Sequence, residues 1–306
     1  MTITHLVTHS GGFHADELLS TVILQRLFPQ AELLRTRDRD WTTPAPGKII
    51  YDVGRVFDAE AQIFDHHQRP NPLREDGQPY SSFGLIWAQY GRDYLRALDV
   101  PEVDIEDVHA SFDKSFVVPV DLVDNGALAP ATAGQLASLT LPALLGTLKP
   151  VFDNNDAGAD DAGFVAALPI ARAFIEGSIN GKAAKRRAHA MVTKAIEEAG
   201  PNRVLELPMG MPFRAAIEDA GADHMLFVVN PRDSDWAIGG IRIQGDSFEQ
   251  RADLPKAWAG LTDGELEEAC GVKGAKFCHN GLFIAVAETR EAALEMARLA
   301  VAEAEA

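Results

Sequence analysis

Phe64-Asp65-His66-His67-Gln68 closes a short apolar run that begins at Ala61, and we take the rest of the chain to be organised around this stretch. Two adjacent imidazoles beside a carboxylate are expensive to bury for packing alone, whereas at the end of a rigid strand they can face one point. Histidine is also the commonest metal-binding side chain. The alternative is a polar strand end that turns into the following Arg-Pro-Asn-Pro loop. The stretch by itself leaves both interpretations open.

A second group of polar residues follows the first apolar run of the chain. A short predicted strand at 4–8 leads into His9, two glycines and His14. Asp16 then stands at the expected N-cap of a helix whose apolar residues recur at helical spacing up to Leu27. The alternative is that Asp16 only caps this helix and that the histidines are solvated.

Further apolar runs at 31–36 and 48–53 are predicted to be strands. Short strands that alternate with helical patterns indicate an α/β fold with a mostly parallel sheet. In such a sheet, ligands gather at the carboxyl ends of the strands. Four polar side chains are expected at such ends: His9, Arg37, Asp52 and Asp65.

The composition excludes several classes of function. The chain has 28 Lys and Arg against 45 Asp and Glu, a formal net charge of −17. Such a chain repels polyanions at long range, so we expect it to bind neither duplex DNA nor an anionic membrane. The two cysteines are too few for a disulfide framework, and neither an export signal nor a membrane span is predicted. We expect a cytoplasmic protein, and a homo-oligomer is compatible with the sequence.

The chain is predicted to contain two α/β domains. An acidic, apolar-poor stretch at 153–161 is expected to be a linker or an exposed loop. We therefore expect a mostly parallel sheet in an N-terminal domain at 1–150 and a second, smaller α/β domain at 151–306. Strands near 204–206, 225–229, 238–243 and 283–286 and a closing helix at 290–304 are expected in the second domain.

Several carboxylates are expected to meet in the first domain. Asp121 and Asp124 are spaced so that they can share one face of a helical turn, and both are candidates for the same position. Gathering Asp16, Asp52, Asp65 and Asp124 around a point would raise their pKa values unless cations compensate the charge. Two divalent ions would do so, with Asp52 as the candidate bridging ligand. Imidazole ligands favour Mn²⁺ over Mg²⁺, with Zn²⁺, Co²⁺ or iron as further candidates.

Five motifs, in this order, resemble one known family. They are Thr8-His9-Ser10-Gly11-Gly12-Phe13-His14-Ala15-Asp16-Glu17, Arg35-Thr36-Arg37-Asp38, Asp52-Val53-Gly54, Phe64-Asp65-His66-His67-Gln68 and Asp121-Leu122-Val123-Asp124-Asn125-Gly126. Their combination is similar to the Myg exonuclease family (melanocyte proliferating gene family), a branch of the DHH phosphoesterase superfamily. Segments near 247–251, 258–261, 277–279 and 289–294 extend the likeness over nearly the whole chain.

The resemblance implies a two-domain α/β enzyme whose DHH-like N-terminal domain holds two divalent metal ions, commonly manganese. The implied metal ligands are His9, His14, Asp16, Asp52, His66 and Asp124. His14 stands where the superfamily usually has an Asp, which makes this site richer in imidazole. His67 and Asp65 are the candidate catalytic residues, with His67 facing the phosphate or handling a proton.

Four basic residues are predicted to contact the substrate: Arg37 at the end of the second strand, and Arg251, Lys256 and His279 in the C-terminal half. For the last three, the alternative is surface charge at Arg251 and Lys256 and a buried, hydrogen-bonded imidazole at His279. The predicted function is a metal-dependent phosphoesterase that hydrolyses short RNA or small nucleotides, 3′-5′ exonuclease-like, with a water activated by two metals. The alternatives are a manganese-dependent pyrophosphatase or nucleotide phosphatase, and a non-catalytic nucleotide-binding module.

Overall fold

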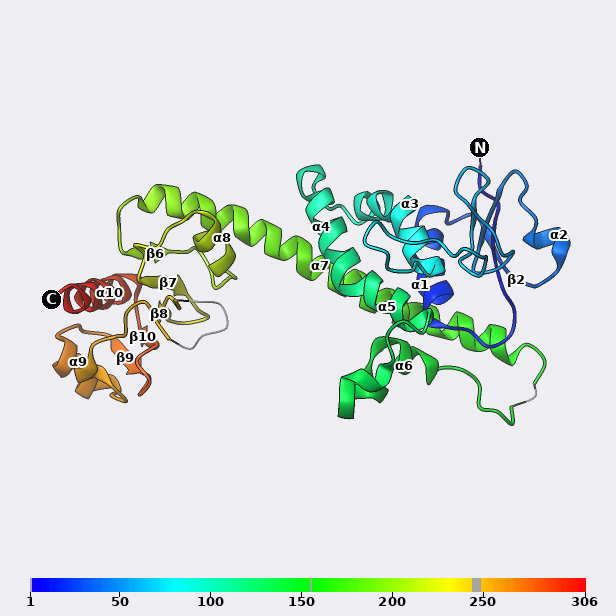
Figure 1. Ribbon diagram of the computed structural model, residues 1–306. Helices are drawn as coiled ribbons and strands as arrows, with labels where there is room; N and C mark the ends of the chain where they lie inside the picture. The colour runs from blue at the N-terminus through cyan, green and yellow to red at the C-terminus, as the bar shows by residue number, and fades with distance from the viewer. Residues whose placement is uncertain (1, 155, 244–248) are drawn as a thin grey trace. The chain divides into compact units, whose positions relative to one another are not determined.

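The computed structural model describes residues 2–154, 156–243 and 249–306. It divides into two compact units, unit 1 up to Ala183 and unit 2 from Ala184 to Ala306. Their helices and strands are labelled in Figure 1. The predicted α/β class is confirmed, because each unit contains a five-stranded sheet and helices.

Unit 1 is built on a sheet with the strand order β2-β1-β3-β5-β4. The strands are β1 (His5–Thr8), β2 (Glu32–Arg35), β3 (Lys48–Tyr51), β4 (Phe57–Asp58) and β5 (Ile63–Phe64). β1, β2, β3 and β5 are parallel, and β4 pairs antiparallel with β5. Because β2 lies on one side of β1 and β3 on the other, the carboxyl ends of β1 and β3 form the topological switch point of the sheet.

Helices cover mainly one face of this sheet. α1 (Ala15–Leu27) and α3 (Ser82–Ala97) pack together, and their apolar side chains share a core with Leu6 and Tyr51. The opposite face is covered more thinly, by residues that include Trp41 of the short α2 (Arg39–Thr42). The remaining elements of unit 1 are η1 (Glu102–Asp104), α4 (Ile105–Phe112), η2 (Asp113–Val117), α5 (Val118–Asp124), η3 (Pro130–Leu139) and α6 (Leu141–Gly146).

The long helix α7 (Ala159–Ala199) contributes to both cores. Phe164 and Ile175 belong to the core of unit 1, and Val192 belongs to a core of unit 2. The units therefore divide inside α7, later than the composition change that set the predicted boundary at 150. By length and composition alone, α7 is the one described helix that could cross a membrane. Core helices meet the same criterion, and Phe164 and Ile175 are fully buried, so this finding alone does not indicate a membrane span.

Unit 2 contains a sheet with the order β6-β7-β8-β10-β9. The strands are β6 (Val204–Glu206), β7 (Phe227–Pro231), β8 (Trp236–Gly240), β9 (Ala275–Cys278) and β10 (Ile284–Ala287). β6 is parallel to β7, and the other pairs are antiparallel. α10 (Arg290–Ala304) packs on one face through residues such as Met296, and the end of α7 and α8 (Arg214–Asp219) pack on the other. The remaining elements are η4 (Lys256–Trp258) and α9 (Asp263–Cys270).

Candidate metal centre

The side chains predicted to bind metal meet at the carboxyl end of the unit 1 sheet. His9 directly follows β1 and Asp52 directly follows β3, so they flank the switch point. His66 lies just beyond β5, Asp16 is in the first turn of α1, and Asp124 is the last residue of α5. The parallel sheet therefore brings five polar residues from distant parts of the sequence to one place.

Asp52 lies between two imidazoles. Its Oδ2 is 3.3 Å from His9 Nε2, and its Oδ1 is 3.4 Å from His66 Nε2. The backbone of Asp52 has a φ of 54°, a left-handed conformation that is uncommon for residues with a Cβ. The hydroxyl of Ser82, at the start of α3, donates to Oδ1 over 3.3 Å. The strained backbone and this hydrogen bond hold one carboxylate oxygen toward each histidine.

His66 also faces two further carboxylates. Its Nε2 is 3.3 Å from Asp124 Oδ2 and 3.9 Å from Asp16 Oδ2. On the other side of the ring, Nδ1 lies 3.3 Å from the Asn125 side-chain oxygen. If Nδ1 donates its proton to this oxygen, Nε2 keeps its lone pair for a cation among the carboxylates.

Burial and neighbouring charges set the protonation of this cluster. Burial raises the pKa of Asp16 well above its ordinary value, and the adjacent carboxylates raise it further. Burial also opposes ionisation of Asp52, but its close contacts with the His66 and His9 imidazoles outweigh it and hold the pKa of Asp52 low. Burial lowers the pKa of His9, and its contacts with Asp52 and Glu17 overcome this and raise the pKa to about 10. Protons on imidazoles and on Asp16 therefore balance the charge when no cation does.

Asp65 and His67 form a pair at the edge of the cluster, where His67 Nδ1 lies 3.6 Å from Asp52 Oδ1 and the pair shares a candidate ligand group with Asp52 and His66. Asp65 accepts hydrogen bonds from the Arg55 amide at 2.6 Å and the His67 amide at 3.0 Å, and its Oδ1 is 2.7 Å from His67 Nδ1. The hydrogen bond to Asp65 raises the pKa of His67. The His67 side chain is 57% exposed, whereas that of Asp65 is 2% exposed. Asp65 thus orients His67 and leaves its Nε2 available to a molecule in the cavity.

With this geometry established, comparison with known proteins identifies the family. The family model MYG1_exonuc, described as "Uncharacterised protein family (UPF0160)", matches residues 5–301. The chain belongs to the MYG1_exonuc family. "MYG1 exonuclease" of Homo sapiens is 32% identical over 324 residues, which cover 97% of this chain and 85% of that protein. "MYG1 protein C694.04c" of Schizosaccharomyces pombe is 30% identical over 323 residues, 98% of each chain.

Solved structures give a weaker similarity. The crystal structure of RecJ from Thermus thermophilus in complex with Mg²⁺ is 15% identical, with a TM-score of 0.28. That match covers 98% of this chain but only 49% of the RecJ chain, so the MYG1_exonuc chain spans about half the length of that protein. A second RecJ structure from the same organism, in complex with Mn²⁺, also has a TM-score of 0.28. A TM-score at this level does not establish a common overall arrangement.

The cluster around Asp52 and His66 has the features of a cation site. Both carboxylate oxygens of Asp16 and the Nε2 of His66 are buried, and none has a hydrogen-bond partner among the described residues. Leaving such atoms unpaired costs about 1–3 kcal/mol each, and more when the group is charged. Asp16, His66 and Asp124 each offer a ligand atom within 4.8 Å of the others. The residues present therefore fit a divalent cation.

Glu17 is part of this centre, although the sequence analysis did not select it. Its side chain is fully buried, it accepts the His14 amide proton at 2.9 Å, and it lies 3.0 Å from His9 Nε2. His9, His14 and Glu17 form a second group whose ligand atoms lie within 4.8 Å. The prediction that Asp16 caps α1 was wrong, because His14 occupies the N-cap and Asp16 points into the cluster. With His14 as N-cap, Glu17 stands at the N3 position and closes a capping box, but a histidine N-cap lacks the Ser or Thr that marks this motif in a sequence.

The structure separates the two candidates on α5. Asp121 is fully buried away from the cluster, where it accepts from Ser81 Oγ at 2.6 Å and the Gly84 amide at 3.1 Å. Arg74 pairs with its other oxygen at 2.6 Å. Asp124 is therefore the member of the pair that reaches the cluster, and Asp121 anchors α5 against the start of α3. A Cβ at Gly84 would collide with this carboxylate, so close packing requires glycine there.

A cavity of about 840 Å³ opens beside the cluster, entirely within unit 1. Its lining includes Asp52, His66, His67 and Asp124, together with Arg69 and Lys149. Arg69 and Lys149 were not among the predicted substrate contacts, because nothing in their sequence context marks them. The predicted contact Arg37 lies at the cluster, with Nη2 3.1 Å from His9 Nδ1 and Nε donating to the Ser10 carbonyl over 3.3 Å.

The other predicted substrate contacts lie in unit 2. Arg251 donates to the carbonyls of Ala222 and Met225 at 2.9 and 3.1 Å, so it holds a loop of its own unit in place. Lys256 is exposed at the start of η4. His279 is exposed and its Nδ1 accepts the Gly281 amide proton at 2.9 Å, so the alternative of a buried imidazole at this position is wrong.

Proposed function

We propose that this chain is a divalent-metal-dependent hydrolase of phosphodiesters, acting on short RNA or small nucleotides in an exonuclease-like manner. The observation that carries the proposal is the position of the Asp52 carboxylate, with one oxygen toward His9 and the other toward His66. A carboxylate in this position could offer one oxygen to each of two metal ions, the pair that a two-metal phosphoesterase uses. The exonuclease names of relatives such as the human protein support the same reaction class.

The side chains divide into two ligand groups that share Asp52. His9, His14 and Glu17 would complete one group, and Asp16, His66 and Asp124 the other. Bound divalent ions would neutralise the carboxylates, polarise a phosphoryl oxygen and lower the pKa of a water nucleophile. We propose manganese, because a mixed set of imidazole and carboxylate ligands suits it better than magnesium.

Residues around the cluster would handle the substrate. His67, oriented by Asp65, can donate from Nε2 to a phosphate oxygen or to a leaving group in the cavity. Its raised pKa keeps the ring protonated to a higher pH, as a donor requires. Arg69 and Lys149 add positive charge to the cavity wall, which attracts a phosphate into a chain that is acidic as a whole.

Hydrolysis of pyrophosphate is the second candidate reaction. The cavity of about 840 Å³ and the net charge of −17 suit a small anion at least as well as a polymer. The two reactions share the metal cluster and differ in what extends beyond the reacting phosphate, so a substrate panel separates them.

The test is hydrolysis by the full chain after chelation and restoration of one metal at a time. Substrates are a 5′-labelled oligoribonucleotide, the matching oligodeoxyribonucleotide, a nitrophenyl phosphodiester and pyrophosphate, with Mn²⁺, Mg²⁺, Zn²⁺ or Co²⁺. We expect stepwise shortening of the oligoribonucleotide that depends on Mn²⁺ and is lost in Asp52→Asn. The control is Asp93→Asn, which changes an exposed carboxylate paired with Arg96. Turnover of pyrophosphate alone would support the second candidate, and activity retained by Asp52→Asn would reject the proposed centre.

A further inference from the structure

β6 is an edge strand whose outer side is unpaired among the described residues. It pairs with β7 only, at one end of the unit 2 sheet. The Arg203 carbonyl accepts from the Phe227 amide at 3.2 Å, and the Leu207 amide donates to the Val229 carbonyl at 2.8 Å. Because backbone groups alternate along a strand, the intervening Val204 and Glu206 direct their N–H and C=O groups away from β7. An edge of this kind can accept another strand.

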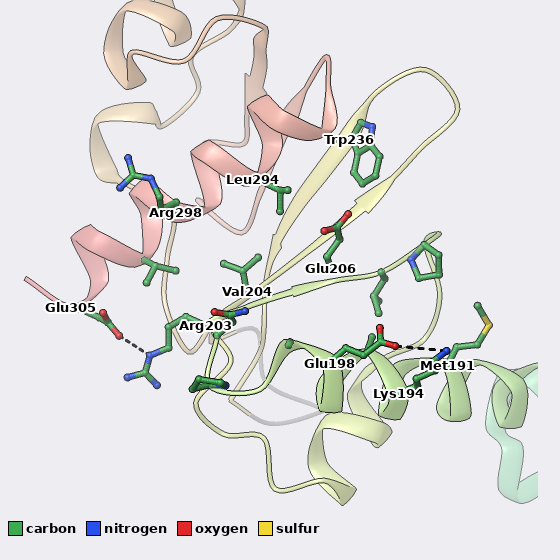
Figure 2. Close-up of a pocket in the computed structure, with 17 residues that line it drawn as sticks. Met191, Lys194, Glu198, Arg203, Val204, Glu206, Trp236, Leu294, Arg298 and Glu305 are labelled. Atoms are coloured by element: carbon green, nitrogen blue, oxygen red, sulfur yellow. Dashed lines mark hydrogen bonds and ion pairs between the residues drawn. The ribbon is translucent and has the colours of Figure 1, made fainter.

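The outer edge of β6 lies in a groove of about 1050 Å³. Residues of α7, β6 and α10 line it, all within unit 2. Figure 2 shows β6 between the two helices, with Met191 on the α7 side and Leu294 on the α10 side. Met191 is 39% exposed. Ala195, Trp236 and Val301 extend the apolar lining, so side chains on both faces of an added strand would meet apolar surface.

The charged residues that line the groove each have a partner, and Lys194 Nζ lies 3.7 Å from Glu198. Arg203 Nε lies 2.6 Å from Glu305, Arg298 Nη2 lies 2.6 Å from Glu295, and Arg290 Nη2 donates to Glu206 over 2.7 Å. No row of cations is therefore left to follow a phosphate backbone, and the carboxylates would repel one. The lining favours a ligand without charge.

The shape of the groove also decides against pairing of β6 with the β6 strand of a second copy of the chain. Lining residues come from helices on both sides of β6, so the strand edge lies at the bottom of the groove. Two recessed edges cannot approach closely enough to form strand hydrogen bonds, which join strands about 4.8 Å apart. A single extended peptide can reach the edge.

We infer that this groove binds an extended, uncharged segment of a partner protein, which adds to β6 as a sixth strand and places apolar residues against α7 and α10. Backbone hydrogen bonds to Val204 and Glu206 provide the attachment, and Met191 and Leu294 select apolar side chains on its two faces. This site is separate from the metal cluster of unit 1, and the inference does not depend on the proposed catalytic function.

The test begins with selection of random peptides of about eight residues, enough to span β6 and the residues that flank it at about 3.3 Å per residue. The full chain is the target, and binding of the selected peptides is measured by fluorescence polarisation. We expect uncharged, β-branched sequences whose affinity falls about tenfold or more in Met191→Glu, because a carboxylate replaces apolar wall. The matched control is Met209→Glu at a methionine that is 54% exposed and outside the groove lining. Enrichment of charged peptides only, no enrichment at all, or equal binding by Met191→Glu would overturn the inference.

A second measurement separates strand addition from general apolar binding. Two versions of a selected peptide carry N-methyl groups on alternate amides, so that only one version loses the N–H groups that face β6. We expect one version to lose binding and the other to keep it. Hydrogen exchange should show the amides of Val204 and Glu206 slowed by about tenfold or more in the complex, with Leu205 and Leu207 protected in both states. Equal binding by both methylated peptides, or unchanged exchange at Val204 and Glu206, would contradict strand addition.

Discussion

Replacing Asp16 by Asn should change the stability of the protein in opposite directions with and without metal. Asp16 is fully buried beside Asp52 and Asp124, and neither of its oxygens has a hydrogen-bond partner among the described residues. In chelator, Asn removes this buried ionisable group. The expected gain is about 1–3 kcal/mol, because the neutral amide is not repelled by Asp52 and Asp124 and its N–H groups can donate to those carboxylates. For a unit of this size, that gain raises Tm by about 2–12 °C.

With saturating metal the order should reverse. A ligand at about 100 times its Kd adds about 2.7 kcal/mol to the native state for each site. Asp16→Asn should lose most of the contribution of the site shared with His66 and Asp124. Calorimetric melts in chelator and across a Mn²⁺ titration measure both effects, with Asp93→Asn as the control for loss of an exposed carboxylate. The melting temperatures of variant and wild type should therefore cross as Mn²⁺ is added.

The effect of Asp16→Asn on stability should also depend on pH. Folding raises the pKa of Asp16, so in chelator the wild-type protein loses stability as pH rises above the ordinary aspartate pKa of about 4. The advantage of Asp16→Asn should grow in the same direction. A variant that is less stable than wild type in chelator, or that keeps the full Mn²⁺-induced rise in Tm, would refute the reasoning.

Three further predictions concern the same unit. In chelator, the free energy of unfolding should fall as pH rises from about 6.5 towards about 10, because His9 and His66 bind protons more tightly in the folded chain than in the unfolded chain. Denaturant melts across this pH range measure the change. A rise in the free energy of unfolding would contradict the assigned protonation of these histidines. His67→Gln should reduce turnover at least tenfold with little loss of bound metal, whereas His66→Gln should reduce both turnover and bound metal. Activity assays and metal analysis measure the two effects. Equal metal loss in both variants would reject the assignment of His66 to metal and His67 to substrate. Gly84→Ala should lower both Tm and Mn²⁺ affinity by displacing α5 from α3. The control is Gly177→Ala inside α7, where no atom lies within 4 Å of the added Cβ; it should preserve Mn²⁺ affinity and not lower Tm, because Ala favours a helix more than Gly.

The sequence supports the strand-end part of the site best. His9, Asp52 and His66 could be placed together because they follow apolar runs, and parallel strands end at one edge of a sheet. Glu17 was not selected because Asp16 was assigned as the N-cap. The N-cap is His14, two residues earlier, and this places Glu17 at N3, beside His9. The spacing of Asp121 and Asp124 on α5 made them equally good candidates for the metal ligand. Only the packing of α5 against α3 shows that Asp124 faces the cluster.

Unit 2 shows the same limits. The strand at Val204–Glu206 and the helix at Arg290–Ala304 lie where the apolar patterns predict them. α9 and β9 were not predicted because their sequences carry little periodic signal, and Leu266 is the one buried residue of α9. The internal contacts of Arg251 could not be foreseen either, because its partners are backbone carbonyls of a loop rather than a residue type that a sequence pattern can reveal.

The central claim is that two divalent ions share the Asp52 carboxylate, and anomalous scattering from crystals grown with Mn²⁺ tests it most directly. We expect two anomalous peaks about 3.5–4 Å apart, one on each side of Asp52. One should lie toward His9 and the other toward His66 and Asp124. A single peak, or peaks that do not contact Asp52, would contradict the account.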